Sequence, residues 1–297
     1  MIFLEEQLTE LARRHLPPAV AEEWIALIRP AIHLRHRTDG EPTLGRLGGL
    51  PSLPGDVPWP SWEGRWSLNF VASLDCGRLP VASLDLDLPA EGTLLFFYLD
   101  NEDGRSFDDE GSELPVPEVA GEDQGSLAET RVLYLPPGVE TAERPAPGDI
   151  VPYPRVELGA RLIATGPDFS HPEFQEAARR VGASERAFMD DYRSAEPIYN
   201  AVTDVMPWPM HWLGGHARPV QDAVELDAAY TAFAGRVGFD DPRLAEEASR
   251  WRPLAQFDSD EAAGMQWGDV GTIYWLMRPG DLAARRFEAA AFTVQYC

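Results

Sequence analysis

The chain has 297 residues, of which 44% are apolar, enough to bury a sizeable core in one large domain or two fused halves. Its 25 basic residues against 49 acidic ones give a formal charge of −24, and every basic residue is Arg because the sequence contains no Lys. This charge argues against nucleic-acid binding, which needs a basic surface, and the missing Lys excludes P-loop and Schiff-base lysine chemistry.

Targeting and cysteine signals are weak. The N-terminal segment, MIFLEEQLTELARRH, has early acidic residues and no long apolar run, so it does not read as a signal peptide. No stretch approaches the roughly 20 apolar residues of a membrane span. Cys76 and Cys297 are too few for a disulfide framework or a Cys-based zinc site. We therefore expect a cytoplasmic protein without membrane contact.

The N-terminal region predicts two helices and then a strand. Leucines at helical spacing predict a helix over 3–16, and Pro17-Pro18 end it and begin a second helix through 24–28. The alternation of apolar and polar residues in 31–37 predicts a half-exposed strand.

The next region alternates loops with strands. Residues 45–66 are rich in Gly and Pro and predict a structured loop, whereas 92–99 is apolar on both faces and predicts a strand covered on both sides. Residues 100–129 hold eleven acidic residues against one Arg, which predicts a solvated loop or an interaction surface. Their start resembles a calcium loop, but the leading carboxylate is missing, which favours an acidic turn. Residues 130–135 predict a further strand.

Helices return in the second half of the chain. A Ser-His-Pro-Glu capping box at 170–173 opens the helices expected at about 170–195, and more are expected at about 222–250. We predict an α+β fold, mainly antiparallel and roll-like, with two pseudo-repeated β units and peripheral helices there and at the N-terminus. The whole chain, 1–297, is expected to form one domain.

The pseudo-repeat covers about 45–100 and 211–277. Its first copy reads GRLGG, LNFVASLD and GTLLFFYL, and its second copy reads HWLGG, WRPLAQFD and GTIYWLM in the same order. Unequal insertions between the elements indicate an old duplication and not a solenoid.

Each copy has a strand with one apolar face and one more polar face that ends in Asp. The polar faces are expected to carry Asn69, Val71, Ser73 and Asp75 in the first copy, and Arg252, Leu254, Gln256 and Asp258 in the second. If the copies face each other about a pseudo-two-fold axis, these faces would line a shared cleft. The alternative is that each faces water, as in many half-solvated antiparallel sheets.

Candidate binding residues follow from this arrangement. They are Asn69, Asp75, His211, Gln221, Arg252, Gln256, Asp258, Trp267 and Asp269. A Trp beside a carboxylate, as at 267–269, can stack a sugar or capture a partner, although an aromatic that pins a loop to the core gives the same pattern.

No residue is predicted to be catalytic or to bind a metal. His211 and His216, with Asp204 and Asp222 nearby, suit a structural loop better than a metal site, because their spacing does not fit one helix face and no Cys supports them. The chain contains no G-x-S-x-G, G-x-G-x-x-G or H-E-x-x-H motif, so no cofactor is expected, although a dispersed Ser/His/Asp site would leave no local signature.

The chain resembles the YwqG-like family of bacterial proteins, also called DUF1963. The resemblance rests on GRLGGLPSLPGDVPWP, LNFVASLD, HWLGGHARPVQ, LAQFDSD, MQWGDVGTIYWL and the closing FTVQYC. It implies a mainly β, roll-like fold with peripheral helices and implies no activity. The family usually carries Gln where this chain has Ser73, and the second copy keeps it as Gln256; it often has an aromatic residue at the position of His216.

Two functions remain open from the sequence. We expect a non-enzymatic cytoplasmic binding protein with a basic partner, because the charge is −24, residues 100–129 are acidic and catalytic motifs are missing. The resemblance implies that such a partner protein is of the immunity or regulatory kind. The alternative is a small-molecule or carbohydrate-acting enzyme whose site lies between the two repeats.

Overall fold

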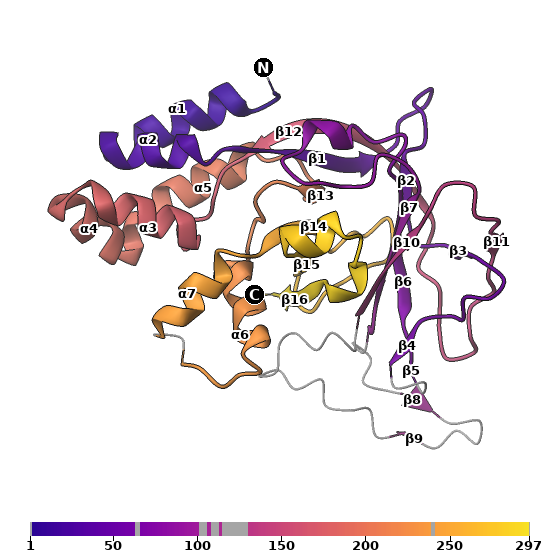
Figure 1. Cartoon of the computed structure of the whole chain (residues 1–297). Coiled ribbons are helices and arrows are strands. Elements are labelled where there is room, and N and C mark those ends of the chain that lie inside the picture. The colour runs from indigo at the N-terminus through magenta and orange to yellow at the C-terminus, as the bar shows by residue number, and fades with distance from the viewer. Residues whose placement is uncertain are drawn as a thin grey trace.

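A computed structural model defines the fold and describes residues 2–62, 66–100, 106–107, 113–114, 130–238 and 241–296. One ten-stranded antiparallel sheet dominates it, and helices lie around the sheet (Figure 1). The α+β, mainly antiparallel fold expected from the sequence is therefore confirmed.

The sheet runs from β10 at one edge to β16 at the other. In spatial order its strands are β10 (Thr130–Leu135), β7 (Thr93–Tyr98), β6 (Asn69–Asp75), β2 (Gly45–Leu47), β12 (Val156–Thr165), β1 (Arg29–His36), β13 (His211–Gly214), β14 (Arg252–Asp258), β15 (Thr272–Met277) and β16 (Ala291–Gln295). Three short two-stranded ladders join β3 (Ser52–Leu53) to β11 (Ala142–Glu143), β4 (Ser61–Trp62) to β5 (Trp66–Ser67), and β8 (Ser106–Phe107) to β9 (Glu113–Leu114).

The strand order is symmetric about the β12–β1 pair. We call β10-β7-β6-β2-β12 the first half-sheet and β1-β13-β14-β15-β16 the second half-sheet. Leu47 of β2 pairs with Ala72 of β6, just as Leu213 of β13 pairs with Ala255 of β14. The two repeated segments thus occupy equivalent places on either side of the central pair.

Both halves also carry a β-bulge at the same point. The register of β6 against β7 shifts at Val71, and that of β14 against β15 shifts at Leu254. The extra residue reverses which side chains point inward, so Val71 and Leu254 are fully buried in the main core. The expectation that Val71 lies on a polar face with Ser73, and Leu254 on one with Gln256, is therefore wrong.

Strand β1 lies at the centre of the sheet and not at an exposed edge. It pairs with β12 on one side and β13 on the other, and residues 31–34 are all buried. The half-exposed strand expected from the alternation of 31–37 is corrected, because His33, on the polar face, is covered by the chain segment before β13.

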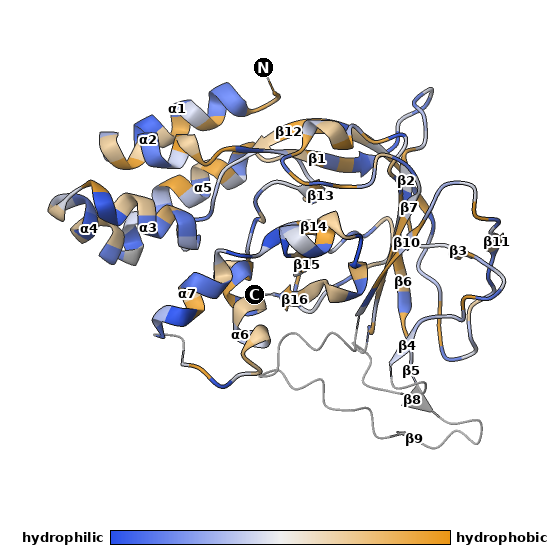
Figure 2. Ribbon diagram, viewed as in Figure 1, coloured by the Kyte–Doolittle hydropathy of each residue, from blue (hydrophilic) through white to orange (hydrophobic). Residues whose placement is uncertain are grey.

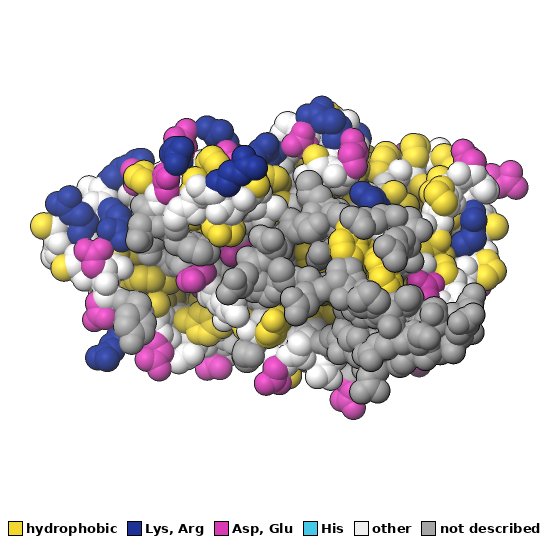
Figure 3. Space-filling view, turned by 90° about the horizontal axis from the view of Figure 1, so that it is seen from below, with side chains coloured by type: hydrophobic (Ala, Val, Ile, Leu, Met, Phe, Trp, Pro, Cys, Tyr) yellow, Lys and Arg dark blue, Asp and Glu magenta, His cyan; other side chains and the backbone are white. Residues whose placement is uncertain are grey.

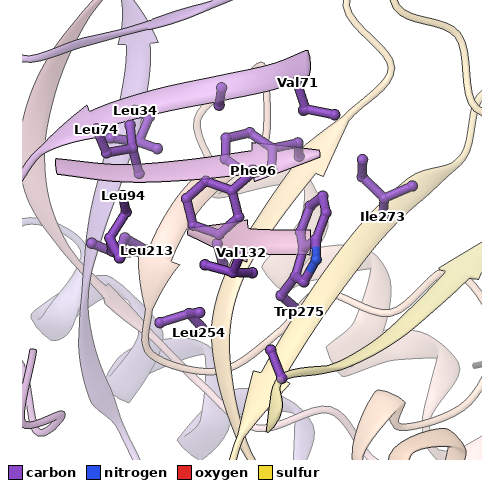
Figure 4. Packing of buried hydrophobic residues seen from close by; sticks show 14 of the residues in the cluster. Leu34, Val71, Leu74, Leu94, Phe96, Val132, Leu213, Leu254, Ile273 and Trp275 are labelled. Atoms are coloured by element: carbon purple, nitrogen blue, oxygen red, sulfur yellow. The ribbon is translucent and has the colours of Figure 1, made fainter. Parts of the chain in front are cut away.

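The sheet curls so that its two halves face each other across the main core. Phe96 of β7 contacts Phe257 of β14 and Trp275 of β15, with ring centroids 5.3 and 5.2 Å apart. Figure 4 shows Phe96 beside Trp275, with Leu74 and Leu94 of the first half-sheet and Leu254 and Ile273 of the second around them. Burial of this inner face on both halves provides the main hydrophobic stabilisation of the roll.

Helices α1 to α5 form one group and α6 and α7 another, both on the left of Figure 1, whereas α8 packs against the main core. Their bounds are α1 (Glu5–His15), α2 (Pro18–Ala26), α3 (Pro172–Val181), α4 (Ala183–Asp190), α5 (Glu196–Val205), α6 (Val224–Ala232), α7 (Pro242–Ala248) and α8 (Pro279–Ala283). Helices α1 to α5 share a small core of their own, and Figure 2 shows hydrophobic and hydrophilic residues alternating along them, as expected for helices with one packed face.

The expected capping box before α3 is not formed. His171 is the N-cap and makes no side-chain cap bond. Ser170 instead donates its hydroxyl to Asp168 and accepts the backbone N–H of Ala223, which ties the start of α3 to the start of α6. A tertiary contact thus replaces the local one that the sequence predicted.

The acidic segment 100–129 lies almost entirely outside the described residues, so the expectations placed on it, a solvated loop, an interaction surface or an acidic turn, stay predictions. In Figure 3, charged side chains of both signs are spread over the described part of the lower face. Within the described chain, no helix has the length and apolar character that crossing a bilayer requires.

Candidate functional site

Three of the predicted binding residues lie close together in the second half-sheet: Gln256 and Asp258 are on its outer face, whereas His211 is on the inner face, where it pairs with Leu34 of the main core. His211, Gln256 and Asp258 come from the adjacent strands β13 and β14, and their side chains are 0%, 1% and 3% exposed. Buried polar groups of this kind must be hydrogen-bonded to be tolerated. Their partners therefore decide whether the group is a binding site or part of the fold.

The chain's own backbone satisfies most of these groups. Asp258 accepts the Met210 N–H at 3.0 Å, and Gln256 donates Nε2–H to the Met210 carbonyl at 2.8 Å. The Gln256 carbonyl oxygen accepts the Arg218 N–H at 2.9 Å. His33 completes the set by donating to the carbonyl of Pro209 at 2.8 Å. Residues 209–210 therefore close this face, and the network holds the segment between α5 and β13 in place.

Burial shifts the pKa values of the groups in this network. It lowers the pKa of His33 to about 4, so the ring is neutral at pH 7. Burial also raises the pKa of Asp258, although hydrogen bonds from Thr272 and Met210 oppose the shift. These shifts are the consequence of a closed, low-dielectric environment, and they occur where the side chains already have partners.

Asp260 joins two histidines at the end of β14. Its Oδ2 lies 2.9 Å from His211 Nε2 and 2.6 Å from His36 Nε2. Because His211 Nδ1 accepts the Asp258 N–H, its Nε2 carries the proton and donates it to Asp260. Burial raises the pKa of Asp260, but the hydrogen bonds from both histidines outweigh burial and lower it overall. Asp260 therefore stays ionised, and it ties β1 to β13 and to the turn after β14.

The remaining predicted residues do not join this group. Trp267 lies in the main core at 1% exposure, which corrects its expected place beside an accessible site. The bulge in β6 reverses the alternation, so Asn69 is on the opposite face from Ser73 and Asp75. The others are placed separately: Arg252 binds Glu173, Gln221 donates to the Tyr296 carbonyl, and Asp269 is exposed. In the part of the chain that is described, no set of three or more His, Cys, Asp or Glu side chains could hold a metal ion.

The first half-sheet presents the same face in an open form. Strand pairing makes Arg46, Ser73, Asp75, Thr93 and Glu157 the counterparts of Trp212, Gln256, Asp258, Thr272 and His33. In the second half-sheet, Trp212 is a large side chain, and Gln256, Asp258 and His33 are hydrogen-bonded to residues 209–210, which cover them. In the first half-sheet the same positions border a cavity of about 390 Å³.

The cavity lies between strands β2, β6 and β7 and the segment that carries β3 and β11, at the right of Figure 1. Polar lining residues are Thr43, Arg46, Ser52, Ser73, Asp75, Arg78, Thr93, Thr141, Arg155 and Glu157, and apolar ones include Leu95, Leu135, Pro136, Pro137 and Val139. Its volume and mixed lining are those of a small-ligand site.

A short side chain at position 73 explains part of this space. In the second half-sheet, Gln256 reaches from the strand to the backbone N–H of Arg218, which corresponds to Ser52 in the first half-sheet. Ser73 and Ser52 both line the cavity, and a Ser side chain is too short to make that bridge. The space that the Gln256 amide fills in the second half-sheet thus corresponds to part of the cavity in the first half-sheet.

Asp75 is the one predicted binding residue among the residues that line this cavity, and its basic residues were not predicted. A signal for it was present, since aligning the two copies places Ser73 opposite Gln256 and Arg46 opposite Trp212. Glu157 of β12 and Arg155, just before that strand, have no such signal, because both are outside the repeated segments. The sequence left open whether the polar faces of the copies line a shared cleft or each face water; in the structure they belong to two separate outer faces, one closed and one open.

The chain belongs to the DUF1963 family. The family model, described as a domain of unknown function, matches residues 45–297 and so includes both repeated segments, β12 and the helices from α3 onward. No curated protein matches the chain.

Proposed function

We propose that this protein acts by binding and that its binding site is the outer-face cavity of the first half-sheet. The observation that carries the proposal is the contrast between the two halves. The second half closes this face with residues 209–210 and uses its polar groups to bond its own backbone. The first half leaves the corresponding polar groups around a cavity of about 390 Å³.

The closed outer face of the second half-sheet shows how the same positions look when they are filled by the chain itself. This comparison supports a binding role for the open face of the first half-sheet more strongly than a surface hollow alone would. Hydroxyl, carboxylate and guanidinium groups on strands β2, β6, β7 and β12 are held by a rigid sheet, so their positions are set before any ligand arrives. Apolar side chains on one wall would exclude water from a bound molecule, and the polar groups on the floor would fix its orientation.

The test compares wild-type protein with Ser73→Gln. This substitution places in the first half the side chain that the second half uses at Gln256, and it should fill the cavity without removing any charge. A metabolite mixture screened by ligand-observed NMR should contain a compound that binds wild-type protein and not Ser73→Gln. If the two proteins bind the same compounds, or if neither binds any, the proposal fails.

A second binding function is favoured by the charge of −24, which would steer a basic protein toward the surface. We propose such a partner, of the immunity or regulatory kind, as the second candidate. Its complex should form at low salt and weaken strongly as ionic strength rises. Capture of the same basic protein at 50 mM and at 500 mM NaCl with equal yield would contradict an electrostatic encounter.

The alternative of an enzyme with its site between the two repeats has less support. That reading needs the polar side chains of His211, Gln256 and Asp258 to be available to a substrate. Each of them instead bonds a neighbouring side chain or a backbone group of this chain. A substrate would have to displace residues 209–210 to reach Gln256 and Asp258, and His211 faces the main core.

A further inference from the structure

The cavity of the first half-sheet holds a guanidinium without a matching negative charge. Arg46 lies on β2, in the floor of the cavity, and within the described residues it makes no ion pair. It donates one N–H to the Leu50 carbonyl and lies 5.5 Å above the ring of Phe70, while its buried Nε–H has no hydrogen-bond partner in the part of the chain that the structure describes. A desolvated cation in this situation gains from any anion that reaches it.

The other charges around the cavity neutralise one another. Arg78 pairs with Asp75 at 3.1 Å, and Arg155 pairs with Glu157 at 2.6 Å. Arg46 is thus left with the excess positive charge of the lining. Burial lowers the pKa of Arg46 and the charge of Arg155 lowers it further, while the nearby charges of Glu157 and Glu143 raise it without reversing the shift. A bound anion would offset the remaining electrostatic cost.

Hydroxyl groups are also present in the lining of this cavity. Ser52, Ser73, Thr43 and Thr93 line the same cavity, and the two paired carboxylates still have lone pairs that can accept hydrogen bonds. Together they offer donors and acceptors at several points around one cationic centre. This pattern suits a molecule with many hydroxyls and one anionic group better than an apolar or a cationic molecule.

We propose that the cavity binds a small polyhydroxylated anion, a sugar acid or a sugar phosphate, with Arg46 holding its carboxylate or phosphate. This inference rests on the proposed function and names the ligand chemistry of the same site. Arg46 donates to the anion through the N–H groups that have no partner among the described residues, and Ser73 and Thr93 contact the hydroxyls. The ligand lies between the sheet and the segment that carries β3 and β11.

Isothermal titration with four probes tests the proposal: glucose 6-phosphate, glucuronate, glucose and inorganic phosphate. We expect glucose 6-phosphate or glucuronate to bind at least about tenfold more tightly than glucose, since a charge-assisted hydrogen bond is roughly twice as strong as a neutral one. The two anionic sugars distinguish a phosphate from a carboxylate ligand, and inorganic phosphate tests whether the anion alone is sufficient.

Three variants separate the possible outcomes. Arg46→Gln should remove the preference for the anionic sugar, Arg46→Lys should retain part of it, and Arg186→Gln, at an exposed position on α4, should leave binding unchanged. Failure of both anionic sugars to bind, or equal binding by wild type and Arg46→Gln, overturns the inference. If glucose itself binds and Ser73→Gln abolishes that binding, the proposed function stands without an anion. If Ser73→Gln leaves the anion bound, the ligand lies outside the cavity and both proposals fail.

Discussion

Replacing Gln256 with Ser should convert the closed outer face of the second half-sheet toward the open form of the first. The amide of Gln256 joins the Arg218 N–H at 2.9 Å and the Met210 carbonyl at 2.8 Å. Its removal leaves two buried backbone groups without partners. Each such group costs about 1–3 kcal/mol, so the expected loss in the free energy of unfolding is about 2–6 kcal/mol. That is a large part of the roughly 5–15 kcal/mol that stabilises a typical protein.

Urea unfolding followed by tryptophan fluorescence measures this loss, and the reciprocal variant Ser73→Gln is its control. Ser73 lines a cavity and Gln256 fills a buried network, so Ser73→Gln should change the free energy of unfolding by less than about 1 kcal/mol. A loss below about 1 kcal/mol in Gln256→Ser would refute the reasoning, because the amide bridge would then be dispensable. Equal losses in both variants would show that the two faces are not open and closed forms of one design.

Three further predictions follow from buried titratable groups. Burial raises the pKa of Asp227 to about 6, so the free energy of unfolding falls as pH rises from 3.8 through 6. Asp227→Asn should therefore be more stable than wild type at pH 8, by up to about 3 kcal/mol. Urea unfolding should show that this gain vanishes near pH 4. Burial lowers the pKa of His33 to about 4, so the stability that neutral His33 contributes is present above pH 6.5 and is lost as pH falls toward 4. The melting temperature of His33→Gln should therefore fall less steeply over that pH range than that of wild type. Identical melting profiles of the two proteins would contradict the assignment. Burial, with a smaller contribution from Asp75, raises the pKa of the Cys76 thiol to about 12; in a Cys297→Ser background it should react with Ellman's reagent only after unfolding, and rapid reaction of the native protein would show that the site opens.

Local sequence patterns predicted the type of many elements correctly. The apolar run at 92–99 is the buried strand β7, and the helical spacing at the N-terminus corresponds to α1 and α2. These predictions succeeded because periodicity and proline positions act over a few residues and do not depend on the rest of the fold. The repeated segments also lie at equivalent places in the sheet, because each carries the same bulge and the same pair of glycines before the next loop.

Predictions failed where a distant part of the chain supplied the partner. The polar alternation of 31–37 indicated solvent on one side, but His33 is covered by Pro209, which is 176 residues away. Ser170 was expected to cap its own helix and instead bonds Ala223. In both cases a polar side chain has several possible partners, and only tertiary packing selects one of them.

The sequence by itself determined the α+β, mainly antiparallel fold, because hydrophobic periodicity and Gly and Pro positions are local and specific. It also contained the difference between Ser73 and Gln256, without indicating what that difference does. Only the tertiary structure decided that residues 209–210 close one outer face while the other keeps a cavity beside Arg46. The physical reason is that the role of a polar side chain depends on whether another part of the chain supplies its hydrogen-bond partners. Pairing of the strands across the whole sheet determines which parts of the chain come close enough to do so.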